Sequence, residues 1–257
     1  HYRRLLRYGG AARPSAADLP EPVTINETNT QPDPLPSLAR VVHGTSVLFW
    51  GLPFAMVVSI MATTSNWTDA VWPLGMLLPP VAFGMLWYGL WLLRSFQPQE
   101  RIWQEALGEV KLLGLFNLGL SPFLHWHHRA PDELGFANAV WLLALVSVFY
   151  LISLNKMLSR LAAMLPDETL RVESKLFSRM NCVLLAVAPI VFGLFHLISL
   201  LDEPPELLHQ LLNTVVSQPW FYMVFVLAFM LIPLSMTMSL LWKTKESILA
   251  SVFHSPH

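Results

Sequence analysis

Long uncharged, apolar runs constrain this chain more than any other feature of its sequence. The first run extends from about Val41 to Ala62 and the second from about Ala70 to Leu93. Each is long enough, as a helix, to cross a hydrocarbon layer of about 30 Å. Because lipid cannot bond to the backbone, a segment that crosses a bilayer must satisfy its own N–H and C=O groups. The runs therefore predict transmembrane helices.

The composition supports a membrane protein. Hydrophobic residues make up 54% of the chain and charged residues 13%, whereas soluble domains have about 25% charged residues. The net charge of −1 predicts no nucleic-acid partner. The single cysteine, Cys182, cannot form an internal disulfide, and nothing in the sequence predicts a cofactor. The polar, basic first residues do not predict a cleavable signal peptide.

The segment from Pro98 to Trp126 joins two kinds of pattern. Its second half is uncharged from Leu112 to Leu124. Its first half places apolar residues on one helical face, namely Ile102, Trp103, Ala106, Leu107 and Val110. We expect one helix that lies on the membrane surface and then enters the bilayer as a third span.

Three more runs follow, at about Leu134–Leu154, Met180–Leu201 and Pro219–Trp242. The third and fifth are preceded by similar proline–acid starts, which favour repeated helical hairpins. A short interfacial helix is expected around residues 207–212. The predicted fold is an all-α, polytopic membrane protein with six transmembrane helices as three hairpins and short interfacial amphipathic helices.

The positive charges test this count. With six spans, all but one of the 16 Lys and Arg residues fall on one side of the membrane, and Arg129 alone falls on the other. Basic loops mark the cytoplasmic side. We expect a cytoplasmic tail at 1–40, a six-helix domain at 41–242 and a short cytoplasmic tail at 243–257, in a protein of a bacterial inner membrane.

The N-terminal tail is a candidate contact region. Arg3, Arg4 and Arg7 form a basic patch that suits anionic lipid. The proline-rich residues behind it cannot bury enough apolar surface to fold alone, so we expect the tail to act as a docking arm for other membrane subunits. Trp103 and Trp126 are further candidates for contact with lipid or a partner, since tryptophan is enriched at membrane interfaces.

The histidine cluster His125, His127 and His128 is the candidate for chemistry. Imidazole is a common metal ligand, and a metal enzyme stays open as an alternative. However, one such cluster supplies fewer ligands than a closed metal site needs. We therefore expect no metal here, and a loop that contacts lipid headgroups or a partner.

The apolar runs lack the groups that many membrane functions need. Their cores contain no Asp, Glu, Lys or Arg, which argues against proton pumps and ion-coupled carriers. Hydrolase and phosphate-binding motifs are absent from the sequence. Asn117 and Asn181 are expected to bond between helices. We expect a non-catalytic integral subunit of a larger membrane assembly. The alternative is a small channel or transporter for an uncharged solute, built from repeated kinked hairpins.

Overall fold

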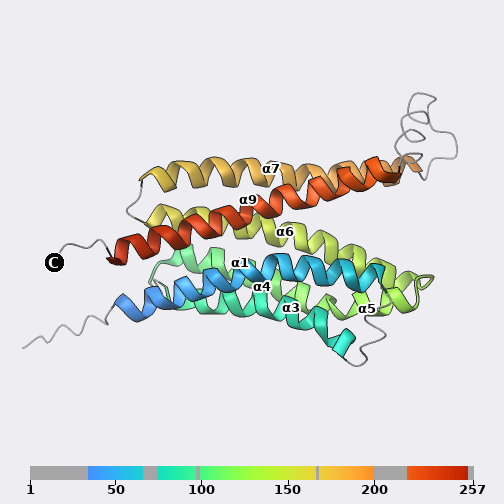
Figure 1. Cartoon of the computed structure of the whole chain (residues 1–257), viewed down its shortest axis with the longest axis horizontal. Coiled ribbons are helices and arrows are strands. Elements are labelled where there is room, and N and C mark those ends of the chain that lie inside the picture. Colours follow the sequence, from blue (N-terminus) through green and yellow to red (C-terminus); the bar gives the residue numbers. More distant parts are fainter. Residues whose placement is uncertain (1–33, 66–73, 97–98, 166–167, 200–218, 254–257) are drawn as a thin grey trace, which may run out of the picture. The chain divides into compact units, whose positions relative to one another are not determined.

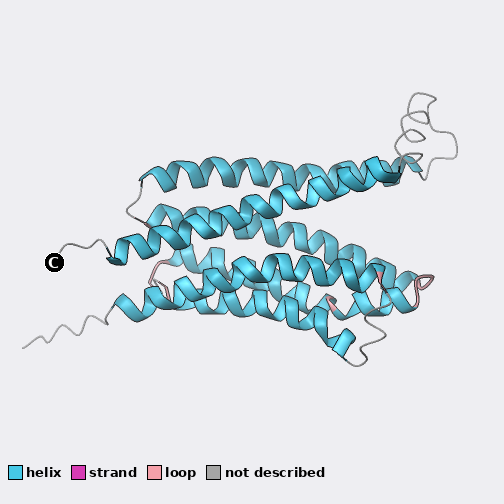
Figure 2. Ribbon diagram, viewed as in Figure 1, coloured by secondary structure: helices cyan, strands magenta, loops and turns pink. Residues whose placement is uncertain are grey.

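A computed structural model describes residues 34–65, 74–96, 99–165, 168–199 and 219–253. These residues form mostly long helices and, in the ranges just given, no strand (Figures 1 and 2). The helices are α1 (Pro34–Thr64), α3 (Leu74–Leu92), the short η1 (Leu93–Ser95), α4 (Arg101–Leu120), α5 (Pro122–Arg129), α6 (Leu134–Met164), α7 (Glu168–Ser199) and α9 (Pro219–Phe253).

The all-α, multi-pass membrane character is confirmed. Among the described residues, four helical segments are long and apolar enough to cross a membrane: Leu38–Thr64, Gly75–Ser95, Arg101–Arg129 and Leu134–Met164. The six-span count and the hairpin grouping remain predictions. Some helices are longer than the predicted apolar runs. For example, α1 begins at Pro34 and α9 continues to Phe253. The tail at 1–33 and the expected helix at 207–212 lie outside the described residues.

The third predicted span differs from expectation in one respect. Its amphipathic half is the first part of α4, and α4 runs unbroken into the apolar half. Ser121 keeps a helical conformation between α4 and α5, with Pro122 as the first residue of α5. The amphipathic half lies along α6, where an Arg160 guanidinium N–H donates to the carbonyl of Ile102 at 3.2 Å. Apart from the exposed Ile102, its apolar face is covered by protein, which explains the amphipathic pattern without a helix lying on the membrane surface.

Long helices that follow one another in the chain run antiparallel (Figure 1). Along α4 and α6, Asn117 meets Ser147 near one end and Ile102 meets Arg160 near the other. For α6 and α7 the same follows from the contacts of Asn155 with Ser178 and of Ile152 with Cys182. For α7 and α9 it follows from the contacts of Asn181 with Pro233 and of Glu173 with Lys243. The starts of α1, α4 and α7 therefore lie at the same end of the bundle as the ends of α3, α6 and α9 (Figure 1).

This arrangement of the helices places most of the described Lys and Arg residues toward one end of the bundle. We call the end just defined the basic end, and the opposite end, which carries α5, the histidine end. Of the described Lys and Arg residues, Arg129 lies at the histidine end. The others lie at or toward the basic end: Arg40, Arg94, Arg101, Lys111, Lys156, Arg160, Arg171, Lys175, Arg179, Lys243 and Lys245.

The half of α6 nearer the basic end is its buried half. The buried residues of α6 show this, because all except Leu143 lie between Tyr150 and Ala162. Trp103 belongs to the same core. It is 0% exposed and packs edge-on against Phe96, with ring centroids 5.8 Å apart. We expected Trp103 to contact lipid or a partner, and the structure instead places it among the helices, because α4 turns its apolar face inward.

Glycines allow the backbones of α1 and α3 to touch. A Cβ added at Gly44 would lie 2.9 Å from the carbonyl oxygen of Gly89, and a Cβ at Gly89 would lie 2.9 Å from Leu48. Among the described helices, α1 and α3 are packed together extensively. Small residues at such crossings allow the close packing that holds membrane helices together.

Gly44→Ala should therefore destabilise the protein. Separating two backbones costs about 1–3 kcal/mol, which exceeds the ~1 kcal/mol that alanine gains in helix propensity. We expect the thermal midpoint in detergent to fall by a few degrees. Gly108→Ala is the matched control, because a Cβ there meets nothing within 4 Å, and it should leave the midpoint unchanged or raise it. Equal midpoints for the two variants would contradict the close crossing.

Candidate functional site

The histidine cluster lies on α5 and does not converge. His125 is fully buried and packs edge-on against Trp126, with ring centroids 6.0 Å apart. His127 projects from nearly the opposite side of α5, since successive helical residues are separated by about 100°, whereas His128 lies three residues from His125 and on a neighbouring side. No group of three His, Cys, Asp or Glu side chains that could hold a metal ion occurs in the part of the chain that the structure describes.

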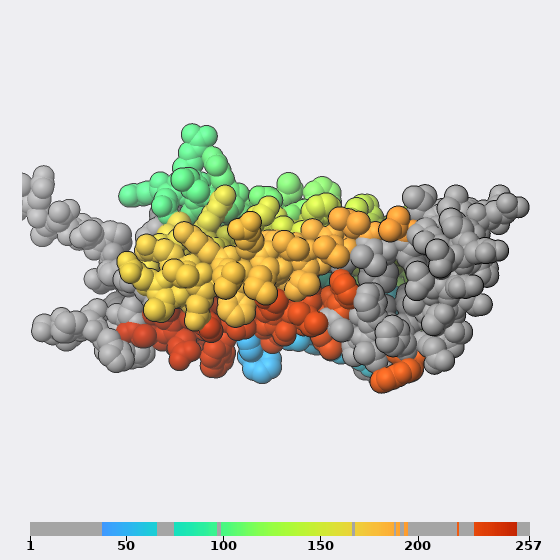
Figure 3. Space-filling view, turned by 90° about the horizontal axis from the view of Figure 1, so that it is seen from above, coloured from blue at the N-terminus to red at the C-terminus, as the bar shows by residue number. Residues whose placement is uncertain are grey.

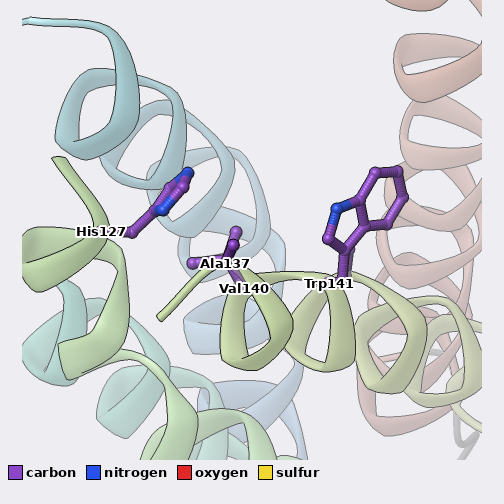
Figure 4. Close-up of a pocket in the computed structure, with 5 residues that line it drawn as sticks. His127, Ala137, Val140 and Trp141 are labelled. Carbon is purple, nitrogen blue, oxygen red and sulfur yellow. The ribbon is translucent and has the colours of Figure 1, made fainter. Parts of the chain in front are cut away.

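A groove adjoins the cluster. It has a volume of about 220 Å³ and is lined by His127 of α5 and by Ala137, Val140, Trp141 and Ala144 of α6. Figure 4 shows His127 and Trp141 on either side of Ala137 and Val140. The Nδ1 atom of His127 is buried and has no hydrogen-bond partner among the described residues. With one polar group among four apolar ones, this groove suits an apolar molecule better than a polar solute.

The aromatic residues beside the groove form a small stack. Trp126 is 37% exposed and stacks on Phe136, with ring centroids 6.4 Å apart. Phe136 also lies 6.2 Å from Phe123. This placement at the end of the bundle is compatible with an interfacial role for Trp126, and its contact with lipid or a partner stays a prediction. Arg3, Arg4 and Arg7 lie outside the described residues.

A second cluster, which we call the polar junction, joins α6, α7 and α9. It consists of Asn155, Ser178, Asn181 and Thr237, all of them buried. The amide nitrogens of Asn155 and Asn181 each donate to the Thr237 hydroxyl oxygen at 2.9 Å. Thr237 in turn donates to the Pro233 carbonyl at 2.8 Å. One hydroxyl on α9 thus binds two other helices.

Backbone carbonyls fix the amide orientations in the polar junction. Asn155 Nδ2 also donates to the Leu151 carbonyl at 2.7 Å, and Asn181 Nδ2 donates to the Pro233 carbonyl at 3.0 Å. A carboxamide turned the other way would place its oxygen against a carbonyl oxygen. The Ser178 hydroxyl completes the junction by donating to the Asn155 carbonyl at 3.1 Å.

The side chains of the polar junction can hold helices together but offer no group for catalysis. Carboxamides do not titrate, and the Thr237 hydroxyl already donates one hydrogen bond and accepts two. It therefore has no free lone pair or proton with which to act as a nucleophile or base. The side-chain oxygens of Asn155 and Asn181 are buried without a hydrogen-bond partner among the described residues. These two acceptors could take the protons of a donor such as water.

Two further polar contacts join α4 to α6. The Ser147 hydroxyl donates to Asn117 Oδ1 at 3.2 Å, and the Ser153 hydroxyl donates to Glu109 at 2.7 Å. The expectation that Asn117 and Asn181 bond between helices is confirmed. Sequence reasoning missed Asn155 and Thr237. Asn155 adjoins Lys156 and so looked like the start of a linker, while a single threonine in an apolar run gives no signal.

Comparison with known proteins adds no family to this description. No protein-family model matches the chain, and neither do any curated protein or any solved structure. Function must therefore be argued from the geometry.

Thr237→Val should loosen the polar junction. The substitution keeps the shape of the side chain but leaves two buried amide nitrogens short of an acceptor, which costs about 1–3 kcal/mol. We expect a lower thermal midpoint in detergent. Thr237→Ser restores the oxygen and should recover most of the loss. Ser235→Ala is the control, because that hydroxyl is exposed and bonds within its own helix. A midpoint for Thr237→Val that matched this control would argue against the junction.

Proposed function

We propose that this protein is a non-catalytic integral membrane subunit of a larger membrane assembly, with a scaffold or accessory role. The observation that carries the proposal is the use of its buried polar side chains. Asn155 and Asn181 both bond to Thr237 and so join three helices, and Ser147 bonds to Asn117 and joins a fourth, α4, to α6. Catalytic and transport proteins direct such groups toward a substrate, whereas here they hold helices in a fixed arrangement.

The alternative, a channel or transporter for an uncharged solute, expects polar or aromatic groups around a cavity near the middle of the membrane. The groove beside His127 belongs to the histidine end and to the first half of α6, and its lining is mostly apolar. The buried amides bond to helices instead of lining that groove. These observations favour a scaffold over a conduit.

The proposal includes a topology. Six spans, paired as three hairpins, would place the basic end in the cytoplasm of a bacterial cell together with both termini. Its support is the positive-inside bias, since eleven of the twelve described Lys and Arg residues lie toward the basic end and Arg129 lies opposite. The length of α6 and α7 agrees, because helices of 31 and 32 residues measure about 46–48 Å and must project beyond the hydrocarbon.

Reporter fusions test the topology. A reporter that is active only in the cytoplasm should be active at both the N-terminus and the C-terminus. The same reporter inserted between α5 and α6, after Ala130, should be inactive, because that connection lies at the opposite end. Activity at one terminus only would mean an odd number of spans, and the proposed orientation would then be wrong.

Purification at natural abundance tests the function. A C-terminally tagged chain, extracted in a mild detergent, should run as a particle larger than a detergent-bound chain of 29.1 kDa. That particle should contain at least one other membrane protein at a fixed stoichiometry. Purified chain alone, reconstituted in vesicles, should not increase their permeability to small uncharged solutes. A particle that contains this chain alone, together with solute-dependent swelling of the vesicles, would overturn the subunit proposal in favour of transport.

A further inference from the structure

The outward face of α7 carries a continuous apolar row. We call it the α7 row, and its members recur every three or four residues and are all exposed: Val172, Leu176, Met180, Val183, Val187, Ile190 and Leu194. The opposite face of α7 is buried and largely polar, with Ser174, Ser178 and Asn181. Figure 3 shows the first part of α7, in yellow, at the surface, with α9 in red beside it. A spacing of three and four residues is the pattern by which two helices pack along a seam.

Lipid accounts for only part of the α7 row. From Met180 onward α7 carries no charged residue, so the row from Met180 to Leu194 can lie against acyl chains. Val172 and Leu176 precede Arg179 by one to two turns and sit in a stretch that also carries Glu173 and Lys175. They are 69% and 58% exposed. Exposed Val and Leu at the level of several charges are not covered by hydrocarbon, so a protein surface is the better cover.

A row of cations runs beside these two residues. Arg171, Lys175 and Arg179 recur every four residues and so lie along one flank of α7. We call them the cation ladder. None of the three makes an ion pair within the described part of the chain, and the Nε atom of Arg171 is buried there without a hydrogen-bond partner. On the other flank, Glu173 is already paired with Lys243.

We propose that the α7 row and the cation ladder form the docking surface for a transmembrane helix of a partner protein, an inference that rests on the proposed function. That helix carries an apolar stripe and, where it leaves the membrane at the basic end, acidic side chains that face the ladder. Exposed Ala186 and Gly193 beside the row allow a close approach. The partner therefore matches this surface in two ways, by apolar contact along the span and by charge at its basic end.

Two other occupants fit less well. A second copy of this chain, related by a twofold axis along the membrane normal, would bring ladder against ladder. Like charges 4 Å apart repel by about 1 kcal/mol in water and about 4 kcal/mol near a protein surface. Anionic lipid headgroups would neutralise the ladder but would leave Val172 and Leu176 uncovered.

The experiment compares two double variants in the tagged full-length chain, purified with its partner. Val172→Gln with Leu176→Gln removes the apolar contact outside the bilayer, and Lys175→Glu with Arg179→Glu reverses half of the ladder. Their controls alter residues of the same kind at the basic end: Ile102→Gln, which is 62% exposed on α4, and Lys245→Glu on α9. We expect each double variant to retain about tenfold less partner, that is ~1.4 kcal/mol, and the controls to retain wild-type amounts.

A photo-crosslinking residue at position 176 provides a second readout. It should crosslink to the partner, while the same residue at position 102 should not. Retention of the partner by both double variants would overturn the docking surface and leave the proposed function standing. Crosslinks from position 176 to a second copy of this chain would also overturn the docking surface. So would a loss of partner by the double variants that occurs only in bilayers containing anionic lipid. A wild-type chain without any stoichiometric partner would instead refute the proposed function.

Discussion

The Thr237 hydroxyl is the interaction on which the arrangement of the last three long helices depends. It is the single oxygen that amides from both α6 and α7 reach, and its own proton goes to the Pro233 carbonyl. In an apolar environment a buried polar group without a partner is costly, so the three helices have one good relative register and poor alternatives. Hydrophobic packing alone would not select it as sharply, because lipid is as apolar as a leucine side chain.

The two ends of the bundle differ in character. At the basic end the helices enclose a core that includes Trp103 and Leu161. Toward the histidine end α6 is largely exposed and borders the groove beside His127. The basic end thus resembles a small soluble helical bundle built on the membrane part, and this explains why an amphipathic α4 is needed there.

The helices could be predicted well from the sequence, but what each side chain contacts could not. Apolar runs were enough to predict the helical class and four segments that can cross a membrane, because both follow from the bilayer itself, while the count of six spans and their grouping as hairpins stay predictions. The limits of the helices were harder to predict, since charge marks where a membrane ends and not where a helix ends. The region 155–179 was therefore read as a linker although α6 and α7 occupy most of it. The prediction that Trp103 contacts lipid or a partner failed for a related reason, because the sequence cannot say whether an apolar face meets lipid or another helix. His125, His127 and His128 were easy to notice, but their directions on α5 could not be foreseen from spacing alone.

The contact between Gly44 and Gly89 also bears on how the protein is made. Because α1 and α3 are consecutive and meet backbone to backbone, their association needs no residue that is synthesised later. Chains emerge from the ribosome at about 5–20 residues per second, so this pair has time to assemble in the lipid before α4 is complete. The remaining helices can then pack against the assembled α1–α3 pair. An error in the α1–α3 crossing would therefore displace every helix that packs later.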